Sequence, residues 1–188
     1  MISGNLEYLM TSLPHLRFDA REQEKKRVQS TLQQYSHNNN GELSAVSILE
    51  NLAKDYLSKP KYQLFQNISL SNIHSTHFRE HNNKMIAQFA SFRYDLMEKL
   101  RRLRHSKGNQ NESAIKSDAI TEGLVGTPLD QEIFLLKLQW DKLAELSIGH
   151  YSDVLALVIY KLKLLLLSRY WSFDQKRGFQ VFLNLTTN

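Results

Sequence analysis

The chain has 188 residues, of which 41% are hydrophobic and 23% are charged, and this composition predicts a folded globular protein and excludes wholesale disorder. It contains no cysteine, which excludes disulfides, thiolate-bound metals and cysteine nucleophiles. Much of the net charge of +5 lies between Arg93 and Lys107, where six Lys and Arg against two Asp and Glu give +4, and this excess favours an acidic partner.

Glycine and proline, the residues on which turn-rich β folds depend, number only 7 and 3. We therefore expect an all-α protein, an elongated bundle of about five to six helices that forms a single domain over residues 1–188. The segment from Asn5 to Leu13 is short and apolar, and either a strand or a helical turn fits it. Residues 1–18 lack the charge and apolar run of a secretory signal, so the expected location is cytoplasmic.

Two helices are expected in the first third of the chain. Asp19 is a candidate N-cap for a polar helix that runs to about Tyr35. The apolar pattern over residues 43–57 predicts a second, amphipathic helix. The following residues, 58–75, are expected to be irregular because they contain a proline and several Asn and Ser.

The clearest helical pattern begins near His77 and runs to His105. Apolar residues recur there every three or four positions, which is typical of one buried helix face. They are Met85, Phe89, Phe92, Leu96, Leu100 and Leu103. Residues 106–127, rich in Gly, Asn and Ser, are expected to form a linker or mobile loop.

Two further helices are expected near the C-terminus. Pro128 and Asp130 open the first, which closes near Gly149. The second, from Val154 to Trp171, is apolar almost all round, as is typical of a helix at the centre of a bundle. Its apolar core of about 14 residues contains two lysines and is shorter than the roughly 20 residues that a bilayer span needs.

Catalytic motifs are missing from the sequence. It contains no GxxxxGK[ST] phosphate loop, no GxSxG elbow and no set of kinase motifs. Its carboxylates, such as Asp141 and Glu145, fall on helix faces where solvated side chains are expected. We therefore expect no catalytic residue, no cofactor and no enzymatic activity.

Three histidines are the best candidates for metal ligands. His74, His77 and His81 would share one face if this stretch were helical, and Glu80 lies beside them. The alternative is a set of solvent-exposed histidines, because polar residues surround them and no HExxH motif is present. This alternative is favoured, and no metal site is expected.

Seven cations are candidates for a partner interface: Arg93, Arg101, Arg102, Arg104, Lys161, Lys163 and Arg169. The first four belong to the basic segment, which either contacts nucleic-acid phosphates or forms the solvated face of a helix. The spacing of Asp95 and Glu98 from neighbouring cations favours the solvated face. The three on the C-terminal helix either meet acidic groups of a partner or extend outward from an apolar helix, and the second case is commoner.

Three stretches of the chain carry a family resemblance. The first is Tyr8-Leu-Met-Thr-Ser-Leu-Pro-His-Leu16 with Phe18-Asp19. The second is Arg93-Tyr-Asp95-Leu96 with Leu100, Leu103 and Arg104, and the third runs from Trp140-Asp-Lys-Leu-Ala-Glu-Leu146 through His150-Tyr-Ser-Asp153 to Arg169-Tyr-Trp171. In order and spacing they resemble the opening segment, the middle helix and the C-terminal helices of a bacterial family encoded beside V-type ATPase subunits.

The resemblance implies a function without an active site. The family's gene neighbourhood, and its likeness to a helical component of the V-type ATPase central stalk, imply a connector between the rotor shaft and the membrane ring. The expected partners are therefore other V-type ATPase subunits, which would hold the chain at the inner face of the membrane. The chain is shorter than typical members in its middle loops. The hypothesis is a non-catalytic coupling or assembly subunit in rotary ion transport, and the alternative is a basic helical nucleic-acid-binding protein.

Overall fold

The computed structural model describes residues 5–35, 44–108, 120 and 123–173, and these residues form helices joined by turns and extended segments, with no strand among them. The helices are α1 (Leu6–Ser12), α2 (Glu22–Gln34), α3 (Ala45–Tyr56), α4 (Lys59–Asn67), α5 (Thr76–Arg79), α6 (Lys84–Gly108), α8 (Pro128–Leu146) and α9 (Val154–Trp171). The expected all-α class is confirmed. The described residues hold more helices than expected, because two short ones precede α6.

The first helix resolves the choice between strand and helix near the N-terminus. Asn5 accepts a hydrogen bond from the amide of Glu7 at 3.0 Å and so caps α1, which ends before Leu13. Residues 13–21, here called the strap, then run without helical structure to α2. The expectation that Asp19 caps α2 is wrong. The carboxylate of Asp19 accepts a hydrogen bond from the amide of Arg21 at 2.9 Å in a local turn, and α2 begins after Arg21, at Glu22.

The third helix forms as expected, and Ser44 caps it by accepting from the amide of Ser47 at 3.1 Å. The expectation of irregular structure over residues 58–75 is wrong for its first half, which forms α4. Pro60 lies in the first turn of this helix, where a missing N–H leaves no hydrogen bond unmade. The proline therefore begins a helix there instead of excluding one.

The helix expected from His77 to His105 is divided in the structure. Residues 76–79 form α5, and α6 begins only at Lys84. The break follows from side-chain capping, because Asn83 accepts a hydrogen bond from the amide of Ile86 at 3.2 Å. At its other end α6 extends to Gly108, so its last residues lie in the expected linker. Of the rest of that linker the structure describes only Ile120 and residues 123–127. The expectation for residues 109–119 and 121–122 lies outside the described residues.

The last two described helices begin with strong caps. Thr127 and Asp130 form a capping box in which each side chain accepts from the other's amide, at 3.2 and 2.9 Å. Asp153 caps α9 by accepting from the amide of Ala156 at 2.8 Å. Within the described residues, no helix combines the length and apolar character that a membrane crossing requires.

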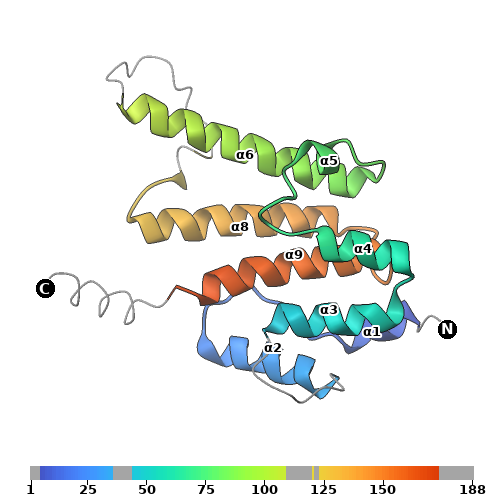
Figure 1. Cartoon of the computed structure of the whole chain (residues 1–188). Coiled ribbons are helices and arrows are strands. Elements are labelled where there is room, and N and C mark those ends of the chain that lie inside the picture. Colours follow the sequence, from blue (N-terminus) through green and yellow to red (C-terminus); the bar gives the residue numbers. More distant parts are fainter. Residues whose placement is uncertain (1–4, 36–43, 109–119, 121–122, 174–188) are drawn as a thin grey trace, which may run out of the picture.

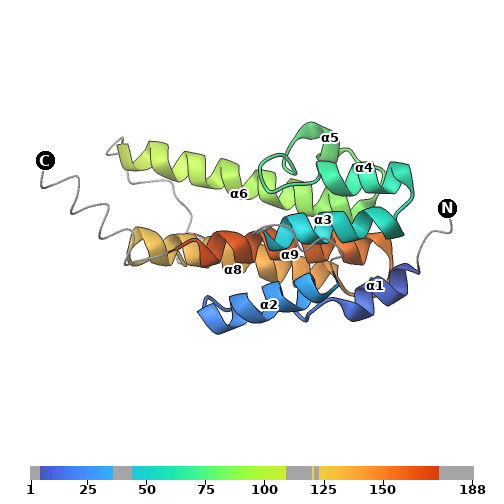
Figure 2. The same ribbon diagram turned by 60° about the horizontal axis from the view of Figure 1, so that its bottom comes forward.

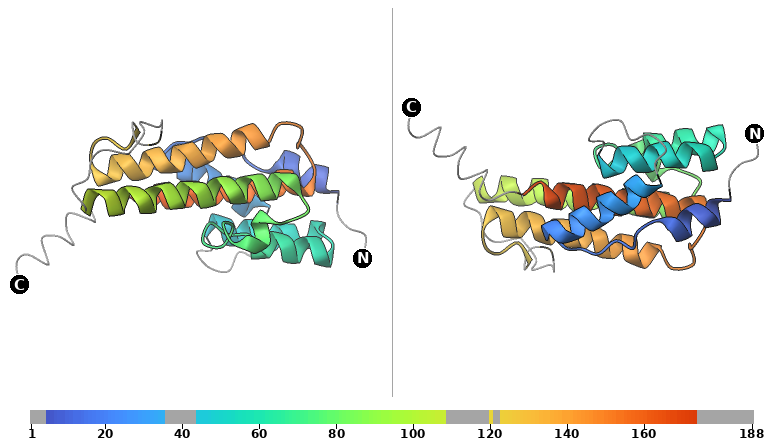
Figure 3. Two further views of the ribbon diagram at one scale, coloured as in Figure 1. Left: turned by 90° about the horizontal axis from the view of Figure 1, so that it is seen from above. Right: turned by 90° about the horizontal axis from the view of Figure 1, so that it is seen from below.

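The long helices lie side by side, with α9 in the middle of the bundle (Figure 1). It packs against α8 on one side and α3 on the other, while α6 packs on the far side of α8. Figure 2 and the right-hand view of Figure 3 show α1 and α2 along the remaining side of α9. A single cluster of buried apolar side chains draws on every helix named above, so α9 has the central position that its apolar sequence predicts.

Candidate functional site

The basic end of α6 is a surface feature. Arg101, Arg102 and Arg104 are all exposed on its last turns. Arg101 donates to the carboxylate of Glu98 at 3.0 Å, one turn earlier on the same helix. These three residues are therefore exposed, and the guanidinium of Arg101 is already paired with a carboxylate of the same helix.

Arg93, expected at the same surface, instead makes internal contacts. Its Nε donates to the carbonyl of Leu70 at 3.0 Å, and its Nη1 donates to the side-chain oxygen of Gln139 on α8. Burial lowers the pKa of this guanidinium, with the carboxylate of Glu132 opposing the shift. Arg93 thus connects α6 to two other parts of the fold, the turn after α4 and the helix α8. Its side chain donates hydrogen bonds within the protein and not at the surface.

Lys161 lies in the core and does not extend outward. Its side chain is 2% exposed, and its Nζ lies 2.8 Å from the carboxylate of Glu50 on α3. The same ammonium donates to the carbonyls of Phe65 at 2.7 Å and Gln66 at 3.2 Å, in the last turn of α4. Burial lowers the pKa of Lys161, while the bond to Glu50 opposes this shift.

The other two cations of α9 lie nearer the surface. Lys163 is half-buried, its Nζ lies 5.1 Å from the centre of the Trp140 ring, and burial lowers its pKa. Arg169 is exposed and donates to Glu132 of α8 at 3.4 Å. Of the three expected interface cations on this helix, Arg169 is thus the most accessible.

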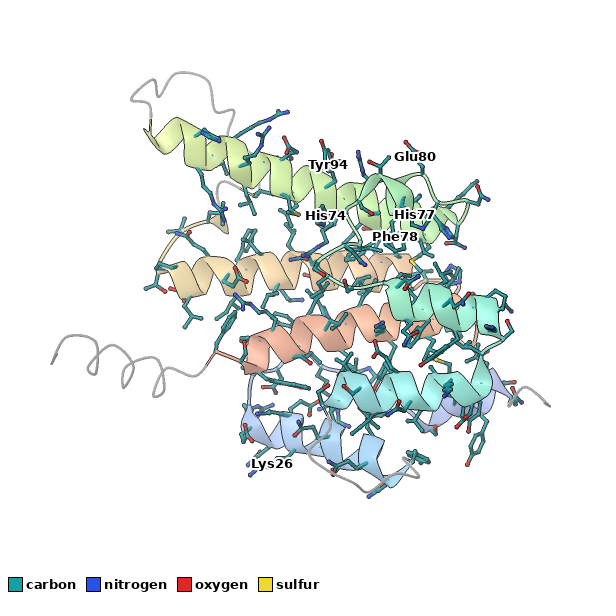
Figure 4. The ribbon with its side chains drawn as sticks, viewed as in Figure 1. Lys26, His74, His77, Phe78, Glu80 and Tyr94 are labelled. Atoms are coloured by element: carbon teal, nitrogen blue, oxygen red, sulfur yellow. The ribbon has the colours of Figure 1, made fainter. Side chains whose placement is uncertain are left out.

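The three candidate metal-binding histidines do not share a helix face. His77 belongs to the short α5 and His74 precedes this helix (Figure 4). His81 follows α5 in the chain. The Nδ1 of His81 accepts from the amide of Asn83 at 3.0 Å, which occupies one possible ligand atom. In the part of the chain that the structure describes, no three His, Asp or Glu side chains gather in an arrangement able to hold a metal ion.

Buried polar atoms without a hydrogen-bond partner occur in the same region. They are Nδ1 of His74 and Nε of Arg79. Such atoms are uncommon in folded proteins, and an ordered water is one ordinary way to satisfy them. Arg79 gains a different contact, because its guanidinium carbon lies 4.0 Å from the centre of the Tyr94 ring on α6.

The strap forms an aromatic cluster with α8 and α9 that the sequence pattern did not predict. The ring of Phe18 stacks on Tyr170 with centroids 4.8 Å apart, and it meets Trp140 at 5.6 Å. The indole N–H of Trp171 donates to the carbonyl of Asp19 at 2.8 Å. The cluster thus connects the strap to α8 and to α9, the last described helix.

Two more side chains hold the strap. The hydroxyl of Tyr160 on α9 donates to the carbonyl of Pro14 at 2.8 Å, and burial raises the pKa of this hydroxyl, which keeps it a neutral donor. Arg27 of α2 donates to the carbonyl of His15 and also pairs with the buried carboxylate of Glu24. Hydrogen bonding to Arg27 lowers the pKa of Glu24, so the carboxylate stays ionised.

A hollow of about 360 Å³ opens beside α6. Its walls include the apolar side chains of Phe92, Leu96 and Ile120. Two carboxylates and two cations also line it, Asp95, Glu98, Lys99 and Arg102. The formal charges of these four side chains balance.

Comparisons with protein-family models, with curated proteins and with solved structures found no match to this chain.

Proposed function

We propose that the chain is a non-catalytic helical subunit of a bacterial V-type ATPase, with a structural coupling or assembly role in rotary ion transport. The observation that supports this most is where the resembling stretches lie in the fold. Phe18 of the first stretch packs between Trp140 and Tyr170 of the third. The indole N–H of Trp171, also in the third stretch, donates a hydrogen bond to the carbonyl of Asp19. Residues distant in sequence thus form one structural unit, as expected of a shared fold.

The second stretch is consistent with the same interpretation. It begins at Arg93, which fastens α6 to Gln139, next to the start of the third stretch. A connector requires rigid helices and charged contact faces, and it requires no active site. In this proposal the chain lies in the cytoplasm and reaches the inner face of the membrane through the complex.

Affinity purification tests the proposal. The shaft and ring subunits of the V-type ATPase are tagged in cells that naturally make the chain, and the recovered proteins are quantified by mass spectrometry. The proposal predicts that the untagged chain is recovered in a fixed ratio to these subunits. Recovery of the other ATPase subunits without the chain would contradict it.

The exposed guanidinium groups of Arg101, Arg102 and Arg104 favour one alternative, a basic helical protein that binds nucleic acid. Such a protein would bind DNA or RNA with an affinity that falls steeply as salt is added, because phosphate contacts release counterions. Neutralising the three arginines would weaken that binding. Lack of binding at low salt would remove the alternative.

A further inference from the structure

One face of α6 runs unbroken along the helix and changes character half-way. Its residues recur every three or four positions, so their side chains lie on one side of the helix. They are Ile86, Ala90, Tyr94, Met97, Arg101 and Arg104. This face is separate from the apolar stripe that holds Phe89 and Leu96 in the core.

The first half of this face is covered and the second is not. Ile86 and Ala90 are 1% and 0% exposed where α5 packs against α6 (Figure 1). Beyond α5, Tyr94 is 36% exposed and Met97 is 44% exposed. The side chain of Arg101 is 66% exposed, and Arg104 is also exposed. A helix face that is core at one end is therefore open at the other.

The open half has cations at both ends and an apolar centre. At one end lies the half-buried Arg79, whose guanidinium carbon is 4.0 Å from the Tyr94 ring centre and whose Nη2 donates to the hydroxyl of Thr76 at 3.0 Å. Met97 lies in the middle, and Arg101 and Arg104 lie at the other end. A rise of 1.5 Å per residue places Arg104 about 15 Å along the helix from Tyr94. We call these five residues the α6 outer stripe.

We propose that the α6 outer stripe binds an acidic amphipathic helix of a partner protein. The length and form of the stripe suit a helix of about three turns, with an apolar side chain against Met97 and carboxylates towards the cations at the two ends. This inference deepens the proposed function by naming a docking surface, and it rests on that function only for the identity of the partner.

The charges beside the stripe favour a protein over a nucleic acid. The carboxylate of Glu98 already forms an ion pair with the guanidinium of Arg101, with an N–O distance of 3.0 Å. Asp95 is exposed one turn earlier on α6. These carboxylates repel a phosphate backbone, and Met97 offers it no favourable contact. A protein helix can place its carboxylates opposite Arg104 and Arg79, an apolar group on Met97 and uncharged residues opposite Asp95 and Glu98, and it then avoids both costs.

Photo-crosslinking in cells that naturally make the chain tests this surface. The full chain carries p-benzoylphenylalanine in place of Met97, and a control chain carries it in place of Lys26, an exposed residue of α2 on the far side of the molecule (Figure 4). We expect a protein adduct at the first position and none of the same identity at the second. Sequencing should place the crosslink in a segment with helical periodicity and a net negative charge.

Charge reversal gives the matched comparison. Arg101→Glu with Arg104→Glu should lower the yield of the adduct at least tenfold, because both cations of one end are reversed. Lys26→Glu with Lys61→Glu makes the same change of charge at exposed sites on α2 and α4 and should leave the yield within twofold. Circular dichroism checks that both variants keep their helix content.

Each result decides the inference. Loss of the adduct in the first variant alone supports it. No adduct at Met97, an adduct with nucleic acid or with a second copy of the chain, or equal loss in both variants overturns it. If the adduct is an acidic helix from outside the ATPase, the docking surface stands and the proposed function fails. If the ATPase recovers the chain without an adduct at Met97, the function stands and the docking surface fails.

Discussion

Lys161 places an ammonium among apolar side chains, and the structure shows how the bundle accommodates it. The carboxylate of Glu50 and two carbonyls at the end of α4 surround its Nζ. Those carbonyls, of Phe65 and Gln66, belong to the last turn of a helix, where no backbone donor is in place to satisfy them. The lysine therefore joins α9 to α3 through Glu50, and it joins α9 to α4 through two carbonyls that would otherwise lack a donor.

We predict that Lys161→Met lowers the free energy of unfolding by about 2–3 kcal/mol, because it leaves both carbonyls without a donor and removes the ion pair of Glu50, whose side chain is 30% exposed. Urea unfolding followed by circular dichroism measures the change. Lys163→Met is the matched control on the same helix: it removes mainly a contact with the Trp140 ring and should cost under about 1 kcal/mol. Equal losses in the two variants would contradict the role given to Lys161.

Glu24 should make part of the stability depend on pH. Its pKa in the folded protein lies below the ordinary value of 4.5, chiefly because Arg27 donates to it. The folded state therefore holds fewer protons than the unfolded state, so the stability it contributes is present above about pH 4.5 and is lost as the pH falls through the lowered pKa.

The variant Glu24→Gln tests this assignment. At pH 7 it should be less stable than the natural chain by about 1 kcal/mol, since Arg27 is partly exposed and solvent weakens the pair. The difference should shrink towards pH 3, because the carboxylate then becomes neutral in both states. Urea unfolding over this pH range measures it, and a constant difference would show that the charge of Glu24 is not the cause.

At the scale of elements, the strap is held mainly by side chains of α9 and α2. We predict that Tyr160→Phe, which removes only the donor to the Pro14 carbonyl, lowers the unfolding free energy by about 1 kcal/mol. Amide hydrogen exchange should speed up in residues 13–21 more than elsewhere. Tyr151→Phe, at a ring that is 77% exposed, should change neither quantity. Faster exchange spread evenly over the bundle would contradict a local role.

The long helices could be predicted from the sequence because each carries its own periodic or continuous apolar pattern. The helix from Val154 to Trp171 was expected with the bounds that α9 has. The short α4 could not be, because proline in a first helical turn and proline in a loop look alike without their neighbours. The break before α6 depends on the Asn83 cap, which competes with the helical pattern around it.

The partners of the cations were harder to predict, because they come from distant parts of the chain. A lysine in an apolar helix suggests either an outward side chain or a buried pair, and only the fold brings Glu50 to Lys161. Likewise, no pattern in the sequence places Phe18 between Trp140 and Tyr170. Arg101, Arg102 and Arg104 were placed correctly on an exposed helix face, because the apolar stripe opposite them fixes which side is buried.

At the scale of the whole molecule, the proposed function makes the protein a connector. A central apolar helix, a strap fastened across it and inward-directed cations make one body, while the outer stripe of α6 remains available to a partner. We expect the purified chain to show no ATP hydrolysis above a buffer control in a phosphate-release assay. Hydrolysis that co-purifies with the chain through further steps would contradict the proposed non-catalytic role.

The measurement that tests the central claim most directly is the ratio of ions pumped to ATP hydrolysed in inverted membrane vesicles, with and without the chain. A coupling or assembly subunit predicts that vesicles from cells lacking the chain show a lowered ratio, and that expressing the chain again restores it. A ratio that is unchanged by loss of the chain, in vesicles whose other ATPase subunits are present in normal amounts, would contradict the claim.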